Sequence, residues 1–472
     1  MKETDSPKGL SRKNKLMVAI IIIGGFITVL NQTVMSPALP TIMREFSINA
    51  SVGQWLTSVF LLVNGLMIPV TAWLIGRFTT RQLYFVAMTC FIAGSAVAAF
   101  STGFSLLFVG RILQALGAGI MMPFSSVMLM LIFPKERRGF AMGIAGIVIG
   151  LGPAFGPTLA GWLVDEFGWR YIFLGIAPVS LIVFVFAIIF LRNIGERTKD
   201  KLDIPSIVLS TLGFGGLLFG FSEAGSSGWL NPVTLGTIAA GAVFVTLFVR
   251  RELHIADPML NLRVLGNPTF SVSTVIGAVV SAGLTVAAVI TPIYLQNVLG
   301  LSAMHSGLML MPGALLMAGL SPVSGTLFDR FGPRGLAIGG LAIMATGTTM
   351  LAFLTEHSSV PYILFAYSFR MAGMALVNMP VNTWGINALP NRRIAHGNAI
   401  NNTARQVTGS MGTAVLVTVM MITAAGHSQP SGAAATVAGI NAAFFGATGL
   451  TLVALVLSIL FVKNDRDAQA RY

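Results

Sequence analysis

The segment Gly146–Gly161, GIVIGLGPAFGPTLAG, decides the fold that we expect for this chain. It lies inside an apolar run from about residue 139 to residue 164, which at about 1.5 Å per residue is long enough to cross a bilayer as a helix. The segment holds five glycines and two prolines, a composition that would break a helix in water. In lipid, neighbouring helices shield the freed backbone groups. The segment therefore predicts a membrane-spanning helix in close contact with other helices.

Small residues recur in this segment at a spacing of four, as Gly146 with Gly150 and Gly152 with Gly156. Such a spacing leaves a flat strip on which a second helix can approach closely. Ordinary helix packing explains the strip as well, but the two Gly-Pro pairs favour a helix that bends and packs at a moving interface. We therefore predict that this helix gates a conformational change through Gly152, Pro153, Gly156 and Pro157.

Composition places the chain in the membrane. Of the 472 residues, 55% are hydrophobic and 10% are charged, whereas a soluble protein has about 25% charged residues. We therefore expect an all-α polytopic membrane protein. The charged residues behind the net charge of +13 are scattered between the apolar runs. This distribution indicates charged loops and not a nucleic-acid interface. The single cysteine, Cys90, excludes an internal disulfide and is expected to be a small packing residue.

Fourteen apolar runs have membrane-spanning length. With the amino terminus placed in the cytoplasm, 24 of the 29 basic residues fall in inside segments, two fall outside, and three lie in or at the ends of spans. The positive-inside rule then predicts a multi-pass protein of the cell membrane with both termini cytoplasmic. The runs lie near residues 16–38, 54–75, 83–100, 104–131, 139–164, 171–191, 204–222, 232–249, 270–296, 306–328, 335–354, 361–388, 398–425 and 437–462.

An internal repeat divides the chain. The sequences AWLIGRFTTR (72–81) and GTLFDRFGPR (325–334) each follow an apolar run and share leucine, arginine, phenylalanine and arginine at the same offset. A repeat of this kind is typical of transporters built from two related halves. We therefore expect a six-helix bundle at 1–200, an inserted pair of transmembrane helices at 201–255, and a second six-helix bundle at 256–472.

Two motifs carry a resemblance to a known family. GLGPAFGPTLAGW followed by WRYIF resembles the fifth-helix antiporter motif of the major facilitator superfamily, in its fourteen-span drug:proton antiporter branch of the EmrB/QacA type. This chain departs from that motif at Ala160-Gly161, where the family has Gly-Gly, and at Ala177, where it favours asparagine. GTLFDRFGPR resembles the superfamily's cytoplasmic loop signature without departure.

The loop signature implies a latch that holds the two halves closed on the inside. Its members here are Asp329, Arg330 and Arg334, and the two arginines are close enough in sequence to pair with the aspartate. A solvated charged turn that merely orients the loop is the alternative. In the first half Gly76 and Thr79 replace the aspartate and the glycine of the signature, so the matching latch there is degraded.

Arg111 lies within the fourth span, where a charged side chain is costly unless it faces a cavity or a partner. Gln114 follows one turn later on the same helical face. RILQALGAGIMMP resembles the family's fourth-helix motif, which implies a role for Arg111 in proton coupling. We predict that Gln114 contacts the substrate. Snorkelling of Arg111 to the outer surface is the alternative. Arg370 begins the matching segment of the second half.

Polar side chains within the spans are the predicted substrate-binding residues. Asn31, Gln32 and Thr33 stand where most of the branch has aspartate-x-threonine in the first span, and this LNQT sequence resembles the lincomycin-resistance members. Hydrogen bonding between helices is the alternative role for Asn31 and Gln32. The region from 378 to 406 is rich in amides, which either line an inner vestibule or join helices to one another. We predict substrate contacts for Asn378, Asn382 and Trp384, and note Asn398, Asn401, Asn402, Arg405 and Gln406 nearby.

Few carboxylates can carry a coupled proton. Glu223 is the most deeply placed outer-side acid, directly after LLFGF of the seventh span, with Asp165 as the next choice. A carboxylate beside lipid or a dry cavity has a raised pKa and can titrate near neutral pH. The alternative is that Glu223 is a wetted loop residue.

The sequence is thus interpreted as a transporter and not an enzyme. Its resemblance implies export of bulky amphipathic or cationic drugs in exchange for protons, whereas proton-coupled import of a small polar nutrient is the competing interpretation. No nucleophile, metal-ligand cluster or nucleotide-binding loop occurs in the sequence, so we expect neither cofactor nor metal. The expected partners are the lipid bilayer, drug-like small molecules and protons, with no nucleic acid, and the expected functional unit is a monomer.

Overall fold

Helices make up all the regular structure that the computed structural model describes, which covers residues 11–194, 203–255, 257–426 and 432–464. Thirteen helices in these ranges are long and apolar enough to cross a membrane. A further helix, α12 (Pro333–Leu351, 19 residues), occupies the predicted run at 335–354 but is not among the thirteen. The predicted all-α membrane fold is confirmed, and helices fill all fourteen predicted runs.

The first half of the chain contains six long helices and a short one. The elements are α1 (Arg12–Thr33), α2 (Met35–Phe46), α3 (Ala50–Arg77), α4 (Thr80–Ala99), α5 (Phe104–Ile132), the 3₁₀ turn η1 (Lys135–Arg137), α6 (Arg138–Phe167) and α7 (Arg170–Phe190).

The predicted first span at 16–38 is too long. The structure ends α1 at Thr33 and starts the separate helix α2 at Met35. Proline at position 37 explains the break, because it has no backbone N–H to donate to the carbonyl of Thr33 four residues earlier.

The rest of the chain contains eight long helices. They are α8 (Ile204–Ser227), α9 (Pro232–His254), α10 (Pro268–Ile293), α11 (Ala303–Phe331), α12, α13 (Val360–Asn387), α14 (Ile394–Ala425) and α15 (Ala433–Phe461). Short turns join some of them: η2 (Leu262–Gly266), the π-helical η3 (Tyr294–Val298) after α10, and η4 (Asn391–Arg393) before α14.

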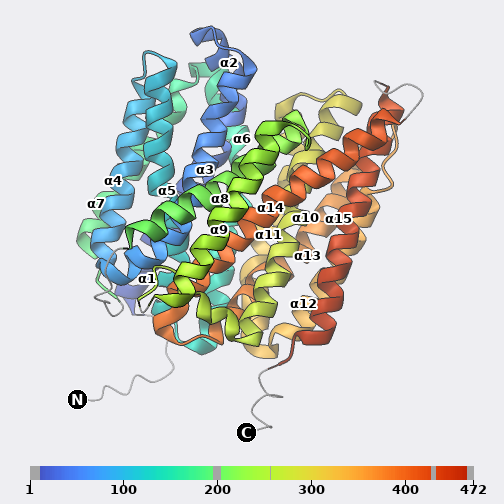
Figure 1. The fold of residues 1–472 in the computed structure, drawn as a ribbon. Helices are drawn as coiled ribbons and strands as arrows, with labels where there is room; N and C mark the ends of the chain where they lie inside the picture. Colours follow the sequence, from blue (N-terminus) through green and yellow to red (C-terminus); the bar gives the residue numbers. More distant parts are fainter. Residues whose placement is uncertain (1–10, 195–202, 256, 427–431, 465–472) are drawn as a thin grey trace, which may run out of the picture.

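The long helices lie side by side in one bundle (Figure 1). Helices α3, α4, α5 and α7 lie on one side of the view and α10 to α15 on the other, with α8 and α9 crossing in front. Helix α1 begins and α15 ends at the same, lower end of the bundle, whereas α2 lies at the opposite end. This agrees with an even number of crossings.

Similar glycine contacts hold one helix pair in each half. A Cβ added to Gly94 of α4 would lie 2.7 Å from the carbonyl oxygen of Gly110 on α5. In the second half, a Cβ added to Gly373 of α13 would lie 2.6 Å from the carbonyl oxygen of Gly340 on α12. Only glycine, which has no Cβ, lets the backbones of the two helices in each pair approach so closely. The predicted domain boundaries near residues 200 and 256 lie outside the described residues, so that division stays a prediction.

Helices α8 and α9 form a hairpin that contacts both sides of the bundle. The Arg251 guanidinium near the end of α9 donates to Asp203 just before α8, at 2.7 and 2.8 Å, and thereby lowers the pKa of that carboxyl group. Leu218 of α8 lies over Gly65 of α3. Trp229, just after α8, donates from its ring nitrogen to a threonine hydroxyl of α14 at 2.7 Å. The pair therefore bridges α3 and α14.

Candidate functional site: a central cavity between the two sides of the bundle

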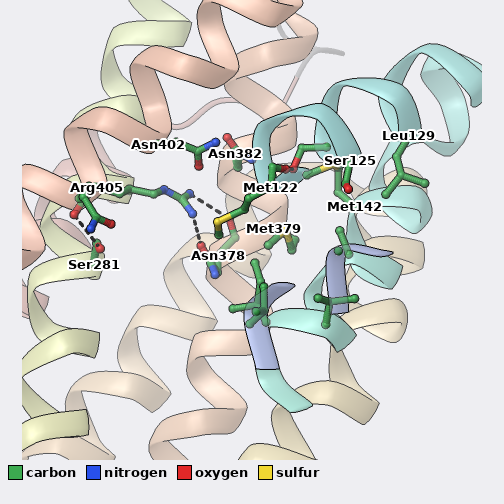
Figure 2. Close-up of a pocket in the computed structure, with 18 of the residues that line it drawn as sticks. Met122, Ser125, Leu129, Met142, Ser281, Asn378, Met379, Asn382, Asn402 and Arg405 are labelled. Carbon is green, nitrogen blue, oxygen red and sulfur yellow. Dashed lines mark hydrogen bonds between the residues drawn. The ribbon is translucent and has the colours of Figure 1, made fainter. Parts of the chain in front are cut away.

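A cavity of about 180 Å³ lies between the two sides of the bundle (Figure 2). Helices α1, α3, α5 and α6 line it from one side, and α10, α13 and α14 line it from the other. Much of the lining is apolar and adaptable, with methionines at positions 122, 142, 374 and 379. Its polar side chains are Ser125, Ser126, Ser281, Asn378, Asn382, Asn402, Arg405 and Gln406.

The polar part of the cavity is organised around α13 and α14. The Arg405 guanidinium donates to the side-chain oxygen of Asn378 at 2.5 Å and to its backbone carbonyl at 3.4 Å. Asn401 donates from its amide nitrogen to the side-chain oxygen of Asn382 at 2.8 Å. Figure 2 shows the Arg405 side chain extending from α14 toward Asn378, with Asn382 and Asn402 nearby. The amide-rich region thus both lines the cavity and joins helices.

The predicted substrate-binding residues divide into two groups. Asn378 and Asn382 line the central cavity. Asn31, Gln32, Gln114 and Trp384 do not line it, and Trp384 is instead part of a hydrophobic core cluster with 5% of its surface exposed. A substrate role for these four residues stays a prediction.

Arg111 is fully buried, so it does not snorkel to the surface. Its guanidinium donates to Asn31 and to Gln114, each at 3.0 Å, and to the backbone carbonyl of Leu56 at 3.2 Å. It also lies 4.3 Å from the centre of the Phe60 ring, a cation–π contact. The predicted neighbour Gln114 is confirmed as a direct partner. The network joins α1, α3 and α5, and none of its residues lines the central cavity.

Arg370 is the corresponding buried arginine of the second half. It is fully buried and donates to the hydroxyl of Thr348 on α12 at 3.2 Å and to the carbonyl of Gly283 on α10 at 2.7 Å. Within the described residues, neither Arg111 nor Arg370 forms an ion pair. Each half therefore holds a buried guanidinium whose hydrogen bonds go to neutral oxygens, with one nitrogen, Nη2 of Arg111 and Nη1 of Arg370, left without a partner.

Asp329 joins the two halves at the end of the bundle where α11 ends and α6 begins. Its carboxylate accepts from the backbone N–H of Gly139 at 2.8 Å and of Phe140 at 2.9 Å. The predicted pairing with Arg330 or Arg334 is absent from the described ion pairs. The first backbone N–H groups of a helix have no partner within it, which explains why the carboxylate binds there instead.

Arg138 adds a second tie between the halves that sequence reasoning missed. At the start of α6 it donates to Asn387, the last residue of α13, at 3.3 Å and to Asn391 in η4 at 3.0 Å. Asn398 of α14 also crosses between the halves and donates to the carbonyl of Pro123 on α5 at 3.1 Å. In the sequence, PKERR (134–138) is similar to PNRR (390–393) in the other half, and this similarity is the one signal that points to these two segments.

Helix α6 changes its partner along its length. In its first part, a Cβ added to Gly146 would lie 2.7 Å from Cβ of Ser321 on α11, and one added to Gly150 would lie 3.1 Å from the backbone nitrogen of Ala318. Beyond that point α6 faces α1, and the hydroxyl of Thr33 donates to the carbonyl of Gly152 at 3.3 Å. The predicted close approach of helices is confirmed, although it involves two partners and not one.

Gly152 and Gly156 form the contact with α1. A Cβ added to Gly152 would lie 2.5 Å from Cγ1 of Val29, and one added to Gly156 would collide with the hydroxyl of Thr33. Pro157 lies in the same helix, and the side chain of Pro153 is outside the described part. Their gating role stays a prediction.

Glu223 lines a second cavity, of about 520 Å³, between α3, α8 and α14. The structure places it inside α8, which continues to Ser227, and not in the loop after that helix. Trp55 and Phe219 stack on one another in the same lining, with ring centres 5.7 Å apart. Gln406 lines both cavities, so the two adjoin. Asp165 is exposed near the end of α6 and lines neither cavity.

Comparisons with known proteins agree with this architecture. The chain is 45% identical over 454 residues to the uncharacterised MFS-type transporter YcnB of Bacillus subtilis, with 96% of each chain covered. It is 37% identical over 457 residues to the lincomycin resistance protein LmrB of Listeria monocytogenes, covering 95% of this chain and 97% of the relative.

Its fold is similar to that of the proton:xylose symporter XylE, with a TM-score of 0.64, 15% identity and 96% of each chain covered. The sequence model of the Major Facilitator Superfamily matches residues 21–413. The chain is therefore a transporter of many membrane-spanning helices and belongs to the major facilitator superfamily.

Proposed function

We propose that this transporter exports bulky amphipathic compounds from the cell in exchange for protons. The observation that carries the proposal is the central cavity, which presents methionines and amides from both halves to one space. Apolar, flexible methionines suit varied ligands, and a few polar groups fix their orientation. The resemblance also implied cationic substrates, and this part stays a prediction. The positive charge of Arg405 in the cavity lining does not favour it.

The direction of transport rests on the relatives. LmrB of Listeria monocytogenes is named for resistance to lincomycin, which an exporter would confer on a cell. The likeness to XylE concerns the fold alone and leaves the direction open. Import of a small polar nutrient is therefore the outcome to be excluded by experiment.

The places where the halves touch support alternating access. Asp329 and Arg138 tie the halves at the end where α6 begins, and the Gly146–Gly150 stretch packs against α11. Release of these contacts would let the halves rock about the cavity. Because the basic residues gather at the loops of this end, we place it in the cytoplasm and the protein in the cell membrane.

Proton coupling is assigned to Glu223 with Arg111. Glu223 supplies the one carboxylate among the described residues that line the second cavity, and Gln406 connects that cavity to the central one. A proton bound at Glu223 could thus respond to the same rocking motion that moves the substrate. Arg111 holds together α1, α3 and α5, so we assign it a positioning role.

Accumulation of lincomycin and of amphipathic fluorescent dyes tests the proposal. Cells that express the chain should accumulate less of at least one compound than cells with an empty vector, and an uncoupler that collapses the proton gradient should abolish the difference. Expression-dependent uptake of a nutrient with no effect on any drug would favour the importer. Export that persists fully under the uncoupler would refute proton coupling.

A further inference from the structure

Arg405 is the one charged side chain among the described residues that line the central cavity. The lining contains no aspartate or glutamate, and neither ion pair in the described residues involves Arg405. Arg405 is half-buried, and a guanidinium in a cavity between membrane-spanning helices without an opposite charge is costly, a cost that nearby neutral oxygens offset only in part. The cavity therefore carries an uncompensated positive charge.

The amides around Arg405 present donors to the cavity. A guanidinium has no acceptor, so the Asn378 side chain must face it with its oxygen, and its amide nitrogen is then turned away. Asn382 likewise uses its amide oxygen to accept from Asn401. None of the described hydrogen bonds uses the amide nitrogen of Asn378 or Asn382, so each nitrogen could donate to a ligand. The polar part of the cavity is thus rich in donors as well as positive.

Helix α10 leaves room for the guanidinium. A Cβ added to Gly277 would lie 3.1 Å from both Nε and Nη2 of Arg405, so a larger residue there would crowd this end of the side chain. Ser281, one turn further on, donates to the backbone carbonyl of Arg405 at 3.1 Å. Methionines 122 and 379 lie beside the guanidinium and Asn378 in Figure 2 and supply apolar surface next to the charge.

We propose, on the basis of the export function above, that the central cavity selects amphipathic carboxylates. Arg405 and the amide nitrogens of Asn378 and Asn382 bind the anionic oxygens, and the methionines contact the apolar body. A carboxylate forms charge-assisted hydrogen bonds with these donors. An amphipathic cation would face Arg405 with a like charge and find no carboxylate in the described lining.

Three probes with the same apolar body and different head groups test this selection. Pyrenebutyrate, pyrenebutanol and pyrenebutylamine carry a negative, neutral and positive head group, and their fluorescence reports binding to the purified full-length protein. We expect pyrenebutyrate to bind at least about tenfold more tightly than pyrenebutylamine, the size of effect that a charge-assisted hydrogen bond gives. Equal or tighter binding of pyrenebutylamine would overturn the proposal.

Variants separate ligand binding from a purely structural role of Arg405. Arg405→Gln should abolish the preference for pyrenebutyrate, and Arg405→Lys should keep part of it. Gly277→Ala keeps the charge but crowds the guanidinium, and it should weaken pyrenebutyrate several-fold with little effect on pyrenebutanol. This variant also carries the test if Arg405→Gln fails to fold. A preference that survives in both Arg405→Gln and Gly277→Ala contradicts the proposal.

A matched control removes a charge outside the cavity. Arg392 is exposed in η4, so Arg392→Gln should leave the preference unchanged. The two proposals fail separately. If cells export drugs but the purified protein shows no preference for the carboxylate, the selection is wrong and the export function stands. If the preference is present but no compound is exported, the export function is wrong.

Discussion

The carboxylate of Asp329, near the end of α11, lies 2.8 Å from the backbone nitrogen of Gly139, at the start of α6 in the other half of the chain. A Cβ at position 139 would meet both this carboxylate and the carbonyl of Gly325, so only glycine permits the contact. The first turn of a helix carries unpaired N–H groups and the positive end of the helix dipole. The contact thus joins the halves through a charge and a helix end, without an arginine.

The first prediction concerns this contact. Asp329→Asn removes the charge but keeps the shape, so it should weaken the tie by roughly 1 kcal/mol or more and increase the population of states open at this end. Ala145 lines the cavity from α6. In a Cys90→Ser background, an Ala145→Cys side chain should react faster with an impermeant maleimide when Asp329→Asn is present.

Glu136→Gln provides the control for this experiment. It removes an acid from the neighbouring turn η1 but leaves the Asp329 carboxylate and both of its hydrogen bonds in place. Its labelling rate should equal that of the parent. A rate for Asp329→Asn no faster than that of Glu136→Gln would show that the contact does not hold the halves closed.

The second prediction concerns the face of α6 that packs on α1. Gly152→Leu and Gly156→Leu should overfill this contact and stop export, because an extra side chain would run into Val29 or Thr33. Gly161 lies in the same helix with nothing within 4 Å of an added Cβ, so Gly161→Leu should export normally. Drug accumulation at matched membrane levels gives the result.

A compensating change tests the mechanism of that loss. Gly156→Ala should impair export, and Thr33→Ala should restore part of it, since the hydroxyl of Thr33 is the atom that the new Cβ meets. Normal export by both leucine variants would mean that this face of α6 does not move or pack tightly during the cycle.

The long helices could be predicted from sequence because each is an apolar run of spanning length between charged turns. The close approach of α6 to its neighbours was also visible in the spacing of Gly146, Gly150, Gly152 and Gly156. The break near Val34 was missed, since the run reads as one span despite its polar residues 31–33, and only Pro37 interrupts its hydrogen bonding.

Contacts between distant segments could not be predicted in the same way. The partner of Asp329 is a backbone group 190 positions away, and no side-chain pattern indicates it. Arg405 stood out only as one polar residue among many, whereas its position in a cavity without acids depends on how α10, α13 and α14 pack. The sequence shows that Arg111 is costly in a span, but the neutral oxygens that accept from it become visible only in the fold.

The third prediction concerns Arg111. Arg111→Ala removes the common donor of Asn31 and Gln114, leaving two buried oxygens unsatisfied at a cost of about 1–3 kcal/mol each. We expect uncoupler-sensitive export to be lost. Because Arg111 does not line the central cavity, pyrenebutyrate binding by the purified variant should stay within about threefold of wild type. Full export by this variant at normal membrane levels would remove Arg111 from the mechanism.

The last prediction concerns the proton. Asn31 carries no titratable group in the first span, and Asp329 is engaged by the backbone of α6 at the end of the bundle. Glu223 remains as the acid that lines a cavity adjoining the substrate site. Because the proton needs a carboxylate, Glu223→Gln should lose proton-driven export, and Glu223→Asp should keep part of it.

Substrate-induced proton release from protein in lipid vesicles shows whether Glu223 carries the coupled proton or has only a structural role. Wild type should release protons when an exported compound is added, and Glu223→Gln should bind the same compound without release. Asp165→Asn is the matched control, since Asp165 is exposed and lines neither cavity, and it should release protons as wild type does. If Glu223→Gln releases protons normally while Asp165→Asn does not, the coupling acid is Asp165, and the second cavity has no part in proton transfer.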